Sequence, residues 1–185
     1  MADQADLAPE LITSEWCNTQ GPISLRGESG KVVVIEAFQM LCPGCVSHGL
    51  PQAQRIAETF NRDQVRVLGL HTVFEHHAAQ GTRAALEAFL HEYRIGFPVA
   101  IDAPAKGEGA IPQTMATYQL RGTPSLILID RFGRLREQHF GQVPDLLVGA
   151  QIMQLVGERE VQSPNSQPPL SGCDDQGCRI PDPSA

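Results

Sequence analysis

Two cysteines separated by two residues are the side chains of this chain best suited to chemistry. They are Cys42 and Cys45, in the segment Cys-Pro-Gly-Cys, and they follow a hydrophobic run. One helical turn brings two thiols at this spacing close together, so Cys45 is placed to attack a mixed disulfide formed on Cys42. The pair therefore predicts thiol–disulfide exchange.

The position of the pair assigns different roles to the two thiols. A helix is expected to begin at Cys42, and a helix N-terminus offers unpaired N–H groups and the positive end of the helix dipole. Both favour a thiolate, so Cys42 is the expected nucleophile and Cys45 the resolving thiol. Pro43 suits the first helical turn, where its missing N–H would have no partner in any case.

Two other interpretations of the pair stay open at this stage: inert core thiols, or part of a metal site. A structural zinc site needs about four ligands, and the only other close cysteine pair, Cys173 and Cys178, lies far away in the sequence. A metal-binding or metal-delivering function would instead combine the dithiol with a histidine such as His71 or His139. We expect no resident metal and no organic cofactor.

The hydrophobic pattern indicates the elements that must position the dithiol. Strands are expected over residues 31–38, 65–70, 97–101, 125–129 and 135–140, and helices after residue 45, around 86–93 and around 148–155. The first of these strands is apolar without alternation, which is typical of a central strand covered on both faces. This order predicts an α/β fold with a central mixed sheet and helices on both faces.

Composition divides the chain and excludes several partners. We expect an N-terminal extension over residues 1–14, one domain over 15–157 and a flexible, proline-rich tail over 158–185. A net charge of −7 without basic clusters argues against nucleic acid, and no apolar run is long enough to span a membrane. Residues 1–10 do not resemble a secretory signal, so the expected location is cytoplasmic, or periplasmic if a leader has been removed.

Three segments together resemble the thioredoxin-like superfamily over roughly residues 15–157. They are the strand and dithiol of 36–45, the Gly-Thr-Pro-Ser segment of 122–125, and the Asp-Arg-Phe-Gly turn of 130–133. The added stretch before residue 122 is similar to the redoxin branch that includes TlpA-type proteins. The resemblance implies a thioredoxin-like fold and a thiol–disulfide oxidoreductase that acts on protein disulfides or dithiols and takes electrons from an unidentified donor.

The resemblance also implies supporting roles for four residues. Pro124 would follow a cis peptide bond, and Thr123, Pro124 and Pro43 would face an extended substrate that uses backbone groups of this loop. Glu36 stands where thioredoxins carry a buried Asp, and it would accept the proton of Cys45. From the residues alone, Glu36 could also be an exposed carboxylate at a strand end, and Pro124 part of an ordinary trans turn.

The sequence departs from thioredoxin itself in several places. The dithiol encloses Pro-Gly rather than Gly-Pro, and Phe38 and Leu41 stand where thioredoxins usually carry Trp. Thr123 precedes the proline where Ile is usual. A peroxiredoxin would need Thr in the place of Gln39. These differences leave the substrate and the redox potential open.

The remaining cysteines carry weaker signals. Cys173 and Cys178 are separated by four residues in a segment with Gly172 and Gly177. We hypothesise that they are a second redox pair that exchanges with Cys42; a local disulfide, an inert pair or a partial metal site are the alternatives. Cys17, beside Trp16, is expected to be a packed thiol.

Overall fold

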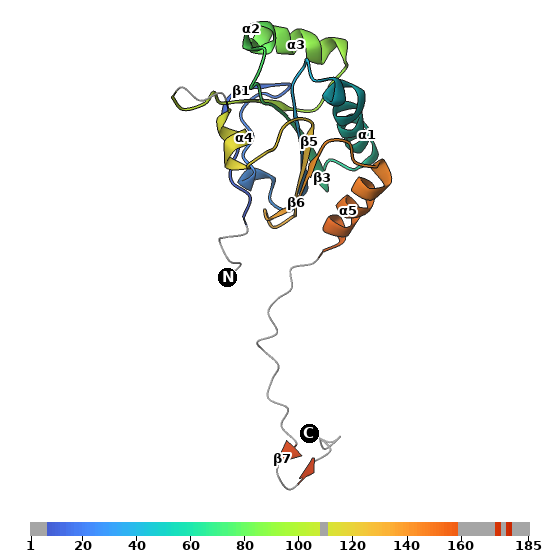
Figure 1. The fold of residues 1–185 in the computed structure, drawn as a ribbon. Coiled ribbons are helices and arrows are strands. Elements are labelled where there is room, and N and C mark those ends of the chain that lie inside the picture. Colours follow the sequence, from blue (N-terminus) through green and yellow to red (C-terminus); the bar gives the residue numbers. More distant parts are fainter. Residues whose placement is uncertain (1–6, 108–110, 159–172, 175–176, 179–185) are drawn as a thin grey trace.

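A six-stranded mixed sheet forms the centre of the molecule in the computed structural model (Figure 1). The structure describes residues 7–107, 111–158, 173–174 and 177–178. The strands are β1 (Thr13–Cys17), β2 (Val32–Phe38), β3 (Val65–His71), β4 (Val99–Asp102), β5 (Ser125–Ile129) and β6 (Leu135–Phe140), in the spatial order β1-β4-β3-β2-β5-β6. Strands β2, β3 and β4 are parallel, whereas β1, β5 and β6 each pair antiparallel.

Helices cover both faces of this sheet. They are α1 (Leu50–Thr59), α2 (His77–Gln80), α3 (Arg83–Glu92), α4 (Gln113–Thr117) and α5 (Asp145–Gly157). All seven residues of β2 are buried, as expected for a strand covered twice. Val34 and Phe38 pack in one cluster with α1, α3 and α5, while Val33 and Ile35 pack with Tyr118 in the other cluster. The predicted fold class is confirmed.

The helix after the dithiol contains a wide turn. It begins at Pro43, passes through a π-helical turn over Cys45–Gly49 and continues as α1. The N–H of Leu50 donates to the carbonyl of Cys45, five residues back. Pro51 has no N–H to donate, and in a regular helix its ring would clash with the carbonyl of Ser47. The π-turn therefore lies where the proline disfavours a regular one.

The N-terminal segment packs onto the sheet. β1 pairs with β4, which lies more than eighty residues later in the chain. Earlier still, the carboxylate of Glu10 accepts hydrogen bonds from the backbone N–H groups of Leu25 and Arg26, and the Tyr118 hydroxyl donates to the carbonyl of Pro9.

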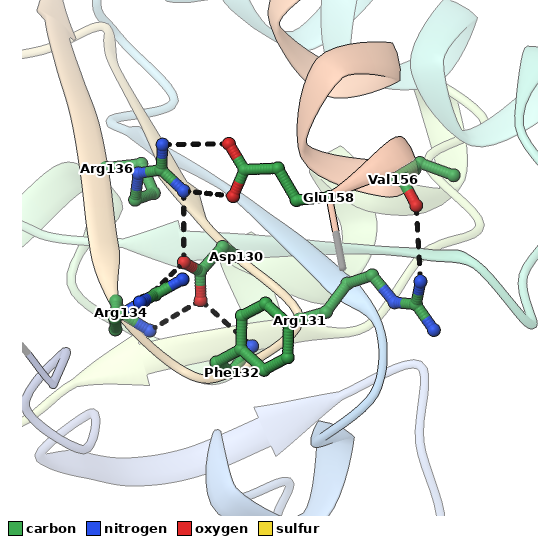
Figure 2. Close-up of polar contacts among 7 residues, drawn as sticks. All are labelled: Asp130, Arg131, Phe132, Arg134, Arg136, Val156 and Glu158. Atoms are coloured by element: carbon green, nitrogen blue, oxygen red, sulfur yellow. Dashed lines mark hydrogen bonds and ion pairs between the residues drawn. The ribbon is translucent and has the colours of Figure 1, made fainter. Parts of the chain in front are cut away.

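A cluster of charged side chains joins the β5–β6 turn to the end of α5 (Figure 2). Asp130 accepts hydrogen bonds from the backbone N–H groups of Phe132 and Arg134, and its other oxygen accepts from the guanidinium groups of Arg134 (2.7 Å) and Arg136 (3.1 Å). Arg136 also pairs with Glu158. Since Arg131 donates to the carbonyls of Gly30 and Val156, the start of β2 and the end of α5 meet at this turn.

Beyond Glu158, the structure describes four residues of the tail. Cys173–Asp174 (β7) and Gly177–Cys178 (β8) form a two-stranded antiparallel ladder in which Cys173 and Cys178 are directly opposite. The side chains of this pair, and the rest of the predicted flexible tail, lie outside the described residues. Within the described ranges, no helix has both the length and the apolar composition that crossing a bilayer requires.

Candidate active site

The dithiol lies just past the carboxyl end of β2, with its two thiols in different surroundings. Cys42 is half-buried, Cys45 is fully buried, and both are free. The backbone N–H of Cys45 donates to the sulfur of Cys42 at 3.3 Å. The accessible sulfur of Cys42, which accepts this hydrogen bond, has the features of an attacking thiol. The buried sulfur of Cys45 has those of a resolving thiol.

The environment of Cys45 keeps this thiol protonated. Burial is the largest influence that raises its pKa, and its contact with Cys42 raises the pKa further. A thiol cannot attack a disulfide until it loses its proton. An attack by Cys45 would therefore need a proton acceptor nearby.

Glu36 provides a carboxyl group in the same buried layer. This residue of β2 is 1% exposed, and among the described residues its Oε1 atom has no hydrogen-bond partner. Burial raises its pKa well above the usual range, and the negative charge of Cys42 adds to the effect. Glu36 is thus a buried side chain and not an exposed strand end. A carboxyl group with a raised pKa can accept and release a proton near neutral pH.

Gly49, which sequence reasoning missed, makes room for this carboxyl group. A Cβ atom at residue 49 would lie 2.1 Å from Oε1 of Glu36 and 2.9 Å from Cβ of Pro124. No side chain fits there without displacing one of these two groups. A glycine inside an expected helix was the available signal, because glycine costs stability there unless a close approach requires it.

The loop of residues 122–124 faces the dithiol. The Thr123–Pro124 peptide bond is cis, which confirms the expectation from the resemblance. The carbonyl oxygen of Thr123 lies 3.5 Å from the sulfur of Cys42. A Cβ atom on Gly44, between the cysteines, would lie 3.2 Å from Cδ of Pro124. The structure therefore brings Cys42, Cys45, Glu36, Thr123 and Pro124 together, with Pro43 exposed beside them.

The family model described as Redoxin matches residues 3–149 of the chain. The chain belongs to the Redoxin family. A solved thioredoxin-like superfamily protein is 59% identical, with a TM-score of 0.80 over 83% of this redoxin and 98% of that chain. A thiol-disulfide isomerase from Corynebacterium glutamicum is 51% identical, with a TM-score of 0.79 over 84% of this chain and 99% of its own. The fold is thus thioredoxin-like.

Curated relatives include the thiol-disulfide oxidoreductase ResA of Halalkalibacterium halodurans. It is 25% identical over 134 residues, which are 72% of this redoxin and 67% of ResA. Other curated relatives are much longer proteins, and the matched part makes up only 13% to 18% of their length.

A small cavity beside the π-turn leads to Glu36. It has a volume of about 50 Å³, and its lining includes Ser47, His48, Gly49 and Gln52. This space is large enough for a water molecule. His48, an exposed residue one turn after Cys45, therefore lies beside the approach to the carboxyl group.

A pair of buried glutamines, also missed from the sequence, holds the segment before the dithiol. The side-chain oxygen of Gln39 accepts hydrogen bonds from Nε2 of Gln80 (3.0 Å) and from the backbone N–H of Phe74. Oε1 of Gln80 accepts from the backbone N–H of Leu41. Gln39 stands where a peroxiredoxin would have Thr. Its hydrogen bond with Gln80 thus connects α2 to the segment before the dithiol.

The histidines of the metal-binding alternative do not form a ligand cluster with the dithiol. His71 is buried beside the ring of Phe38, and burial lowers its pKa to about 4. The ring of His139 hydrogen-bonds Gln151 at 3.0 Å. In the part of the chain that the structure describes, no group of three or more His, Cys, Asp or Glu side chains could hold a metal ion.

Proposed function

We propose that Cys42 and Cys45 are the redox-active dithiol of a thiol–disulfide oxidoreductase that exchanges disulfides with protein substrates. One observation carries the proposal: an accessible and a buried thiol lie one helical turn apart, between a cis-proline loop and a buried carboxyl group without a partner on Oε1. The names of the similar isomerase and of ResA support the same reaction class.

The first step is the attack of the Cys42 thiolate on one sulfur of a substrate disulfide. A new bond joins Cys42 to that sulfur, and the other substrate sulfur leaves as a thiolate. The backbone of Thr123 lies beside the reacting sulfur, where it can pair with an extended substrate as an added strand would.

The second step is the attack of Cys45 on the sulfur of Cys42. The Cys45 proton passes to Glu36, the Cys42–Cys45 disulfide forms, and the second substrate sulfur leaves as a thiolate. The substrate gains two electrons and the dithiol loses two, so a thiol or dithiol donor must reduce the pair before the next cycle. In a reducing cytosol the protein would act as a reductase.

Insulin reduction with dithiothreitol as donor tests the proposal. We expect Cys42→Ser to abolish reduction and Cys45→Ser to accumulate mixed disulfides visible on a non-reducing gel. Cys17→Ser is the matched control, because Cys17 lies in β1 outside the site. The assignment of roles fails if iodoacetamide labels Cys45 faster than Cys42 near pH 7.

A redox titration of the pair against glutathione would then give its potential. A value well below that of the cytosolic glutathione pool identifies a reductase, and a value well above it identifies an oxidant.

A further inference from the structure

An aromatic ring and a guanidinium group lie together beside the cis-proline loop. Phe140, the last residue of β6, is 49% exposed, which is unusual for a large apolar side chain. The guanidinium carbon of Arg121 lies 5.2 Å from the centre of its ring. This is a cation–π contact. The mechanism proposed above uses neither residue.

The pair is continuous with the reacting sulfur. A Cβ atom on Gly122 would lie 2.9 Å from the Phe140 ring, so the ring covers the residue next to Thr123. The N–H of Gly141 donates to the carbonyl of Pro124, which fixes the end of β6 against the loop. With Thr123 O at 3.5 Å from the Cys42 sulfur, only the backbone of Gly122 and Thr123 connects the ring to that sulfur, a path on the order of 10 Å at about 3.8 Å between consecutive Cα atoms.

Arg121 keeps its charge available to a partner. Its side chain is exposed, and the ion pairs found among the described residues include Arg134 and Arg136 of the β5–β6 hairpin but not Arg121. Arg134 and Arg136, for comparison, both pair with Asp130, and Arg136 also pairs with Glu158. Because the chain carries a net charge of −7, Arg121 places a charge of the opposite sign beside the loop that faces the dithiol.

We propose that Arg121 and Phe140 form a recognition surface for a substrate polypeptide that carries an acidic residue and an apolar residue about three positions from its disulfide cysteine. The inference rests on the proposed function. A strand added at Thr123 advances about 3.3 Å per residue, so its third residue reaches the Phe140 ring. An apolar side chain there packs on the ring, and a neighbouring carboxylate pairs with Arg121.

Two synthetic peptides with one cysteine each test this proposal. Both carry a mixed disulfide to thionitrobenzoate and a Leu three residues from the cysteine, but the residue beside that Leu is Asp in one peptide and Lys in the other. Attack of Cys42 on the peptide sulfur releases coloured thionitrobenzoate and leaves the peptide on Cys42. Measuring this release gives kcat/KM for each peptide.

We expect the wild type to prefer the Asp peptide about fivefold to tenfold, Arg121→Ala to remove most of this preference, and Arg121→Glu to reverse it. The matched control is Arg62→Ala, which removes an exposed positive charge before the amino end of β3. This residue lies at the end of the strands opposite the dithiol. The control variant should leave the ratio unchanged. We expect Phe140→Ala to lower kcat/KM for both peptides by about fivefold and Phe140→Leu by less.

Two outcomes separate this inference from the proposed function. If the wild type releases no thionitrobenzoate and does not reduce insulin, the proposed function is wrong. If the wild type is active but treats the two peptides alike, or if Arg121→Glu leaves their ratio unchanged, the recognition surface is wrong.

Discussion

Two acidic side chains are equally hidden in this molecule and have opposite surroundings. Glu36 and Asp130 are each 1% exposed. Asp130 is surrounded by donors: burial alone would raise its pKa, but the hydrogen bonds from Arg134, Phe132 and Arg136 together outweigh burial and lower the pKa (Figure 2). Glu36 has no partner on Oε1, and burial raises its pKa.

The difference shows that one buried carboxyl group of this molecule contributes to stability, whereas the other is suited to proton transfer. A buried carboxylate with several donors is stabilised as an anion. Asp130 holds the β5–β6 turn together, and Arg131 joins this turn to α5. A buried carboxyl group with an unpaired oxygen costs stability but can exchange a proton. The first lies where the hairpin turns, and the second lies beside the dithiol.

Removing the partnered carboxylate should give the largest loss of stability. We expect Asp130→Ala to lower the free energy of unfolding by about 3 kcal/mol, because it leaves two guanidinium groups without their buried partner; their partial exposure limits the loss. Urea denaturation measures this difference. Asp130→Asn, which keeps an oxygen for the backbone N–H groups, should lose about half as much. Equal stability of Asp130→Ala and the wild type would contradict the structural role.

Filling the space beside the other carboxyl group should cost somewhat less. We expect Gly49→Ala to lower stability by about 2 kcal/mol, since the added methyl group overlaps Glu36 and Pro124. The control is Gly149→Ala in α5, where no atom lies within 4 Å of the added Cβ and where alanine should stabilise by about 0.5–1 kcal/mol. If both substitutions change the free energy of unfolding in the same direction, the close packing at Gly49 is wrong.

Neutralising Glu36 should change stability less and the kinetics more. We expect Glu36→Gln to be about 1–2 kcal/mol more stable than the wild type near pH 8, because an unpaired buried carboxylate is removed. Since the folded-state pKa is raised, the stabilising effect of the protonated Glu36 is complete below the usual value of 4.5 and is lost as the pH rises through the raised pKa. The advantage of the variant should therefore shrink toward about pH 5 in urea titrations.

The same variant should slow the release of substrate from the mixed disulfide by at least about tenfold. Stopped-flow measurements from about pH 6 to about pH 9 would show a pH dependence in the wild type that the variant lacks. An identical rate over this range in both proteins would exclude Glu36 as the proton acceptor.

Two truncations should have the smallest effect on stability. A chain ending at Gly157 loses the Arg136–Glu158 pair, and one ending at Glu158 keeps it; we expect them to differ by about 0.5 kcal/mol, as for other partly exposed pairs. Removing the tail also tests whether it takes part in catalysis. If Cys173 and Cys178 pass electrons to Cys42, turnover should fall while the labelling rate of Cys42 stays the same. Equal turnover would leave the tail without a catalytic role.

Sequence patterns predicted the parts of this molecule whose causes are local. The unbroken apolar runs of β2 and β5 can only be buried strands, and the Asp130–Gly133 turn has its hydrogen bonds between residues close in sequence. β1 was missed because its segment is mostly polar and its partner lies far along the chain. The Gln39–Gln80 contact was missed for the same reason, since 41 residues separate the two amides.

Within the candidate site, too, the local features could be predicted from the sequence and the contacts between distant segments could not. The dithiol is visible as a spacing, and Glu36 as a charge inside an apolar run. The cis bond before Pro124 was expected only from resemblance, because nothing in Gly-Thr-Pro distinguishes it from a trans turn. The place of Gly49 depends on the π-turn, and no periodicity signals a turn that is one residue wider than its neighbours.

That wide turn makes the length of the segment between Cys45 and Leu50 as important as its composition. Each residue of a regular helix rotates the chain by about 100°, and the π-turn accommodates one residue more than a regular turn would. Deleting one residue among Val46, Ser47 and His48 would restore regular winding, in which the ring of Pro51 meets the carbonyl group four residues before it. Substitutions that keep the length of this segment should therefore disturb the packing around the dithiol less than the deletion of a single codon, because only the deletion forces the Pro51 ring against the preceding turn.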